Sequence, residues 1–142
     1  MHSDKYFIEE TLKIANAIGL KDEVPVAALV VVDGKIIGKG NNQVEMLQDP
    51  TAHAEMIAIT AACHYIGSKY LSQATLYVSL EPCAMCKAAI AHAQIKRVVF
   101  ATKDTSSNKN NTEYILLDDA SIQQDASQMV SQFFKQKRKN KF

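Results

Sequence analysis

The sequence lacks a long apolar run: no stretch approaches the roughly 20 apolar residues that a membrane-spanning helix needs. We also expect no secretory signal, since the first residues show no basic stretch leading into an apolar segment. Cysteine is scarce, with three among 142 residues, and an odd number without an export signal favours the reducing cytoplasm over a disulfide framework. We therefore expect a cytoplasmic protein that is neither secreted nor held in a membrane.

The length and a hydrophobic content of 47% fit one domain over residues 1–142. No internal repeat, low-complexity linker or shift in composition marks a second domain. The charge is unevenly spread, because residues 135–142 carry five of the 16 Lys and Arg and no acid, which leaves a net charge of −4 on the rest. Such a basic tail can neutralise the phosphates of a nucleic acid; the alternative is a solvated, frayed end.

Apolar spacing and turn residues predict an opening helix and hairpin, followed by alternating helices and strands. Helices are expected at residues 4–20, 51–66, 83–94 and 121–137, and strands at 26–32, 35–40, 75–80, 97–101 and 112–117. Asp4 is the candidate cap of the first helix, and Asp33-Gly34 is the candidate hairpin turn. Residues 41–50 and 104–111 are polar and are expected to be loops. This order predicts an α/β fold, a three-layer α/β/α sandwich around a mixed sheet.

Cys83 and Cys86 form a Cys-x-x-Cys pair, which could be a redox pair, half of a four-cysteine zinc site or two buried thiols. A redox pair calls for a thioredoxin-like context, which the surrounding sequence does not show. A four-cysteine site needs a second pair, and only Cys63 remains. Because the two cysteines lie three residues apart in the first turn of an expected helix, their sulfurs share one face. The helix N-terminus also favours their thiolate forms.

A second motif places His53 and Glu55 in the first turn of the preceding helix. If both helices begin at the same edge of the sheet, His53, Cys83 and Cys86 can converge on one point. Three protein ligands that leave a fourth position for water are typical of a catalytic zinc site. Glu55 would sit beside that position and carry protons. Taken singly, His53 could be a helix cap and Glu55 an acid favoured by the helix dipole.

His-x-Glu followed by Pro-Cys-x-x-Cys is the zinc-deaminase signature. The likeness is carried by residues 24–28, 49–56, 75–86 and 95–100 and by Phe133-Phe134 ahead of basic residues. These segments resemble the bacterial tRNA adenosine deaminases, a family within the zinc-dependent cytidine and deoxycytidylate deaminase superfamily.

The resemblance implies a cytidine-deaminase-like fold with a mixed five-stranded sheet, and a homodimer. It implies hydrolysis of the wobble adenosine of a tRNA anticodon loop to inosine, with release of ammonia. At the matching positions, His53, Cys83 and Cys86 would bind one Zn²⁺ per chain. Glu55 would move the proton while hydroxide attacks C6 of the purine.

The resemblance also implies residues that hold the base. Asn42 would hydrogen-bond it, and the side chain of Val26 and the backbone N–H of Ala54 would complete the pocket. A flipped-out anticodon base suits such a pocket, because loop bases are already partly unstacked. Without the resemblance, Asn41-Asn42 is typical of a simple turn.

The tail has two interpretations. Phe134 could stack on a nucleotide while Lys137 and Arg138 contact phosphates. Alternatively, Phe133 and Phe134 could be the apolar anchor of the last helix.

Other functions stay open because the segment after Phe100 is shorter than in the family. The nearest is a deaminase of free bases, such as guanine deaminase, which shares both motifs. A cytosine or nucleotide deaminase fits the flanking residues less well. A catalytically idle, zinc-stabilised RNA-binding module is a different class, and Glu55 argues against it, since a structural site has no use for an acid there.

Overall fold

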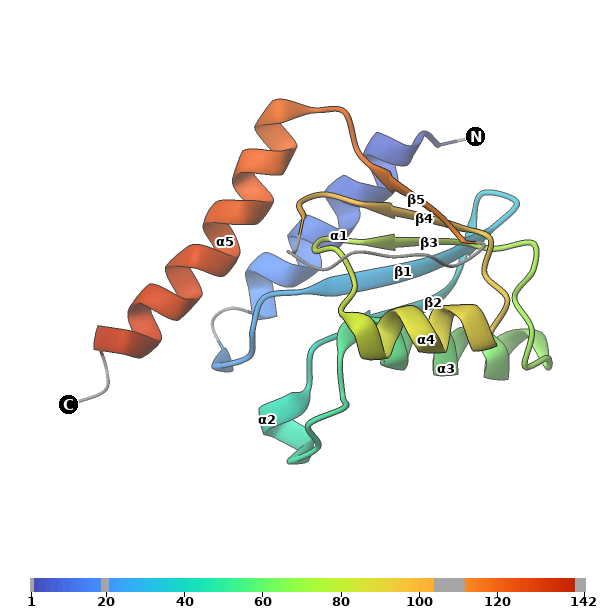
Figure 1. Cartoon of the computed structure of the whole chain (residues 1–142), viewed down its shortest axis with the longest axis horizontal. Helices are drawn as coiled ribbons and strands as arrows, with labels where there is room; N and C mark the ends of the chain where they lie inside the picture. The colour runs from blue at the N-terminus through green and yellow to red at the C-terminus, as the bar shows by residue number, and fades with distance from the viewer. Residues whose placement is uncertain (1, 19–20, 104–111, 140–142) are drawn as a thin grey trace.

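A computed structural model describes residues 2–18, 21–103 and 112–139 (Figure 1). In this part of the chain five strands form one mixed sheet in the order β2-β1-β3-β4-β5. The strands are β1 (Ala27–Val32), β2 (Lys35–Asn41), β3 (Thr75–Val78), β4 (Arg97–Phe100) and β5 (Glu113–Leu116). Strand β1 runs antiparallel to β2 and β3, and β3, β4 and β5 run parallel. The expected mixed five-stranded sheet is confirmed; the expected loop at residues 104–111 lies outside the described residues.

Helices cover both faces of the sheet (Figure 1). They are α1 (Asp4–Ile18), α2 (Val44–Leu47), α3 (Ala54–Ile66), α4 (Ala84–His92) and α5 (Ala120–Lys139). Alternate residues of β1 face opposite layers: Ala28 and Val30 pack with α3 and α4, and Leu29 and Val31 pack with α1 and α5. The three-layer α/β/α sandwich is therefore confirmed. None of the helices in the described ranges has the length and apolarity to cross a membrane.

The two motif helices begin later than their sequence predicts. Asp49 accepts hydrogen bonds from the backbone N–H and the hydroxyl of Thr51, at 2.9 and 2.7 Å, and this turn delays the start of α3 until Ala54. His53 is consequently the residue that precedes α3, and Cys83 likewise precedes α4. The expected loop at residues 41–50 contains the single helical turn α2.

Helix α3 lies unusually close to β2 because both contribute small residues. A Cβ built on Gly38 would collide with the Ala58 carbonyl, and one built on Gly40 would collide with the Ala54 carbonyl. The glycines therefore allow the backbone of α3 to rest on the strand. This contact fixes the start of α3, which carries Glu55 and directly follows His53.

A Gly40→Ala variant is expected to lose about 1–3 kcal/mol of unfolding free energy, since the new methyl group would force α3 off the sheet. Urea unfolding followed by circular dichroism measures the loss. An unchanged midpoint would show that α3 can shift without cost.

Asp4 does not cap its helix. The hydroxyl of Ser3 accepts the Tyr6 N–H at 3.3 Å instead. The Asp4 carboxylate accepts two hydrogen bonds from the Arg97 guanidinium, at 3.0 and 2.6 Å, and one from the Tyr77 hydroxyl at 2.6 Å. This contact ties α1 to β3 and β4, and the Arg97 hydrogen bond lowers the pKa of Asp4 below its usual value.

The lowered pKa of Asp4 makes part of the stability depend on pH. The ionised carboxylate stabilises the fold above the pKa of the unfolded chain, and this contribution is lost as pH falls through the folded pKa. Because both side chains are about one-third exposed, an Asp4→Asn variant is expected to lose only about 1 kcal/mol at pH 7. Urea unfolding of both proteins from pH 7 to pH 3 should show the difference shrinking, with Glu9→Gln as the exposed control. A constant difference would contradict this account.

Candidate metal centre

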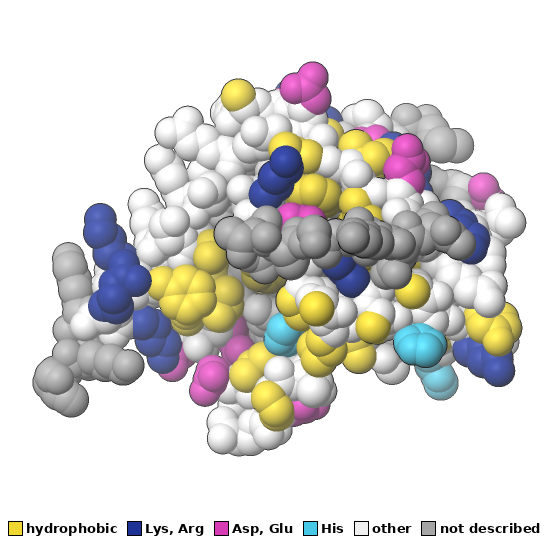
Figure 2. Space-filling model, viewed as in Figure 1, with side chains coloured by type: hydrophobic (Ala, Val, Ile, Leu, Met, Phe, Trp, Pro, Cys, Tyr) yellow, Lys and Arg dark blue, Asp and Glu magenta, His cyan; other side chains and the backbone are white. Residues whose placement is uncertain are grey.

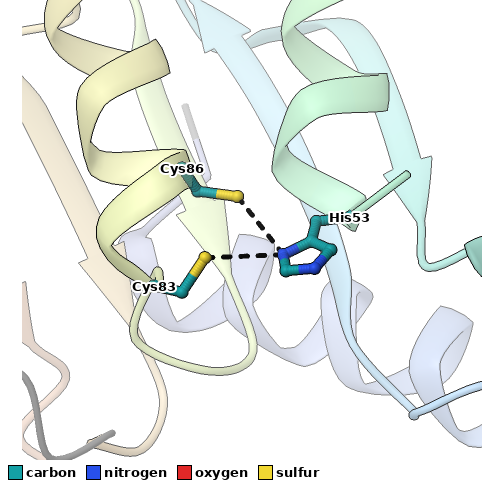
Figure 3. Close-up of side chains that lie close together, drawn as sticks. All are labelled: His53, Cys83 and Cys86. Carbon is teal, nitrogen blue, oxygen red and sulfur yellow. Dashed lines mark hydrogen bonds between the residues drawn. The ribbon is translucent and has the colours of Figure 1, made fainter. Parts of the chain in front are cut away.

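The structure brings three of the sequence-derived site residues together (Figure 3). His53 Nδ1 lies 3.5 Å from Cys83 Sγ and 3.6 Å from Cys86 Sγ, and the donor atoms all lie within 4.8 Å of one another. Helices α3 and α4 pack side by side on one face of the sheet, so their N-terminal ends meet at the same edge. The convergence expected from the two motifs is thus present.

One imidazole nitrogen and two sulfurs are ligand types that zinc binds. A closed structural zinc site has four protein ligands, whereas this group supplies three. Burial is the main cause that raises the pKa of the Cys86 thiol, and the nearby Glu55 adds to it. Holding both sulfurs as thiolates therefore calls for a positive charge beside them, which a divalent cation provides. The group can hold a metal ion on the chemistry of its donors.

Glu55 lies in the first turn of α3, and its side chain is only 4% exposed. Burial raises the pKa of Glu55 to about 7, although its own backbone N–H and the Cys86 thiol act in the opposite direction. A carboxyl group with a pKa near neutral can both take up and give up a proton at physiological pH.

A cavity of about 590 Å³ opens beside the His53–Cys83–Cys86 group, a size typical of small-molecule sites. Its wall includes His53, Glu55 and Cys83 together with the expected pocket residues Asn42 and Val26. From α5, Phe133, Phe134 and Lys137 reach the same cavity. Neither Ala54 nor Arg138 is among the residues that line it.

Asn42 is fixed in the wall by the start of α3. Its Oδ1 accepts the backbone N–H of Ala54 at 2.8 Å, and its own backbone N–H donates to the Val26 carbonyl at 3.1 Å. Because an N–H donor requires an acceptor, this contact fixes which side of the Asn42 amide carries the oxygen. The NH₂ group is the donor that Asn42 can offer to a ligand.

Sequence reasoning missed the acidic residues around the cavity. Glu23 is buried, and its carboxylate accepts the backbone N–H groups of Glu45 and Met46, which holds α2 at the rim. Asp22 forms an ion pair with Lys137 at 2.7 Å. Figure 2 shows the basic side chains at the end of α5 next to acidic ones. No local sequence pattern predicts these contacts, because each joins segments that are distant in the sequence.

Comparison with known proteins agrees with this geometry. The family model for the cytidine and deoxycytidylate deaminase zinc-binding region matches residues 1–102. The tRNA-specific adenosine deaminase of Aquifex aeolicus is 40% identical in an alignment of 146 positions, which covers 96% of this chain and 97% of the relative.

Solved structures show the same relationship. One from a study of A-to-I editing by tRNA:A34 deaminases at the wobble position of transfer RNA has a TM-score of 0.76 and 32% identity, over 88% of this chain and 99% of that one. Guanine deaminase from Bacillus subtilis has a TM-score of 0.70 and 38% identity, over 73% of this chain and 67% of that one. The chain therefore belongs to the zinc-binding cytidine and deoxycytidylate deaminase family, alongside the tRNA-specific adenosine deaminases that it matches over nearly its full length.

Proposed function

We propose that the chain is a zinc-dependent hydrolase that converts the wobble adenosine of a tRNA anticodon to inosine and releases ammonia. The observation that carries this proposal is the nearly full-length likeness to tRNA-specific adenosine deaminases, combined with a buried Glu55 next to the His53–Cys83–Cys86 group. Zinc would be held by these three residues, one ion per chain. When bound, zinc supplies a water nucleophile that is ionised near neutral pH.

Glu55 carries the protons of the reaction. Its carboxylate takes a proton from the attacking water and passes it to N1 of the adenine ring, while the water oxygen bonds to C6. The carboxylate then carries the second proton of the water, from the new C6 hydroxyl, to the exocyclic amine. The C6–N6 bond breaks and ammonia leaves, while C6 becomes a carbonyl and N1 keeps the first proton, as in inosine. Burial suits Glu55 to this cycle, because a pKa near 7 makes both directions of transfer accessible.

Asn42 and Val26 would orient the base in the cavity. The NH₂ group of Asn42 donates to an acceptor nitrogen of the purine edge, and the Ala54 backbone N–H acts through Asn42 by keeping its amide oriented. Val26 supplies an apolar contact for the ring. Adenine then lies with C6 toward Glu55.

The end of α5 would contact the RNA around the flipped base. Phe134 is 44% exposed at the cavity and is positioned to stack on a neighbouring nucleotide. Lys137, whose pKa the Asp22 carboxylate raises, would exchange that partner for a phosphate, and Arg138 would contact another.

A Phe134→Ala variant is expected to raise KM for an anticodon stem-loop about fivefold to a hundredfold while leaving kcat nearly unchanged, since one stacked base is worth about 1–3 kcal/mol. Steady-state kinetics on the RNA measures both constants. An unaltered KM would make Phe134 only an anchor of α5.

Guanine deamination is the second candidate function, because the solved guanine deaminase is 38% identical over 73% of the chain. The test is a parallel assay of the zinc protein on an anticodon stem-loop with adenosine at the wobble position and on free guanine, adenosine, cytosine and cytidine. Inosine in the stem-loop, with no ammonia from the small molecules, supports the RNA function. Ammonia from guanine with an untouched stem-loop overturns it.

A homodimer fits the outer side of α3. Leu47, Met56 and Ile57 border a depression there, and Leu47 is 53% exposed. An apolar surface of this kind is suited to a second copy of the chain. Sedimentation of the wild type against an Ile57→Asp variant tests this, and a wild-type monomer would contradict it.

A tRNA substrate is consistent with a protein that works in the cytoplasm. We propose that residues 1–142 act there as a single deaminase domain.

A further inference from the structure

Lys87 is a buried cation immediately after the second cysteine of the metal centre. Its side chain is 5% exposed, and among the described residues it is the one lysine or arginine that is buried. The ammonium group lies 3.2 Å from Glu81 Oε2 and 5.4 Å from the centre of the Tyr114 ring. Taking such a charge out of water is costly unless partners surround it, so the contacts of Lys87 must offset a desolvation penalty.

The ion pair encloses the turn that carries both cysteines. Glu81 lies two residues before Cys83, and Lys87 lies one residue after Cys86. Helix α4 begins inside this span, and the Lys87 N–H donates to the Cys83 carbonyl at 2.9 Å. A contact between the two ends of the span therefore restricts how far the cysteines can move apart.

Both ends of the span are also fixed to the sheet. The Glu81 N–H donates to the Thr102 carbonyl at 2.8 Å, just beyond the end of β4. Tyr114 belongs to β5, pairs with Val98 of β4, and packs against the core between the sheet and α4. The Glu81–Lys87 pair thus joins the cysteine turn to the two strands on one side of the sheet.

We propose that Lys87 is a positioning residue of the metal centre: its ion pair with Glu81 holds the Cys83–Cys86 turn in the geometry that binds zinc. This inference rests on the proposed zinc function and deepens it. The pair has no net charge, so it acts on the geometry of the sulfurs rather than on the total charge around them. Groups that orient metal ligands from outside typically change metal affinity by about tenfold to a hundredfold.

Two variants separate positioning from general stability. Lys87→Met leaves the Glu81 carboxylate partly buried without this cation and is expected to lower the urea midpoint of unfolding. The double variant Glu81→Gln with Lys87→Met removes both charges, and such a replacement is often neutral for stability. Lys13→Met is the matched control, because it breaks an exposed pair with Glu10 on α1, remote from the cysteines.

The zinc affinity of each protein is measured by competition with a chromophoric chelator, and cobalt-loaded samples report the thiolate geometry through their visible spectra. We expect the double variant to recover most of the wild-type urea midpoint while binding zinc about tenfold to a hundredfold more weakly and showing an altered cobalt spectrum. The Lys13→Met control should match the wild type in all three measurements.

A double variant with wild-type zinc affinity and cobalt spectrum would overturn the positioning role. If the wild type binds zinc and the double variant binds it equally well, the positioning role is wrong but the proposed function stands. A wild type that binds no zinc would overturn the proposed function and the positioning role together.

Discussion

A Glu55→Gln variant is expected to keep its zinc and its fold and to lose about 10²- to 10⁴-fold in kcat. The amide has nearly the shape of the carboxyl group but cannot accept the protons of the attacking water or pass them to N1 and to the leaving amine. Glu55 is buried, and it lies in the first turn of α3 directly beside the converging His53, Cys83 and Cys86. Ammonia release and inosine formation from an anticodon stem-loop measure the loss.

The same variant distinguishes an enzyme from a binding module. Its zinc content and its affinity for the stem-loop should equal those of the wild type, because Glu55 is not one of the three converging donors. Retained turnover would contradict the proton-carrying role. The idle, zinc-stabilised RNA-binding module would instead be supported by two results together: the wild type shows no turnover, and the variant has the same effects on RNA as the wild type.

A Cys86→Ala variant is expected to lose both bound zinc and all measurable turnover. Removing this sulfur leaves one nitrogen and one sulfur, too few donors to retain zinc against dialysis. Chelation of zinc from the wild type should abolish turnover in the same way, and added zinc should restore only the wild type. Metal analysis after dialysis and the stem-loop assay measure the two losses.

Cys63 supplies the matched control for this experiment. It lies near the far end of α3, is half-buried, and is not part of the converging group. Burial raises the pKa of the Cys63 thiol, which keeps it protonated and inert. A Cys63→Ala variant should retain zinc and turnover. Equal loss in both variants would indicate that cysteine substitution damages the fold rather than a metal site.

The helices and strands were predicted from local sequence patterns. The Asp33-Gly34 pair predicts the hairpin, and both residues have the positive φ angles, 51° and 75°, that such a turn requires. The β-branched run before it became β1, and the order of elements was enough for the three layers. The helix starts were less accurate, because two side-chain acceptors decide where α3 begins: Asp49 accepts the Thr51 N–H, and Asn42 accepts the Ala54 N–H.

The identity and spacing of the metal-centre donors and of Glu55 can be read from the residues alone, because the chemistry requires those residue types at the starts of two helices. The pairing of Asp4 with Arg97, the pairing of Lys137 with Asp22, and the burial of Lys87 against Glu81 and Tyr114 became known from the folded chain. Most of these contacts join residues far apart in the chain. Hydrophobic periodicity and capping patterns report only on near neighbours, so the partner of a charged side chain becomes known when the packed layers bring the distant segments together.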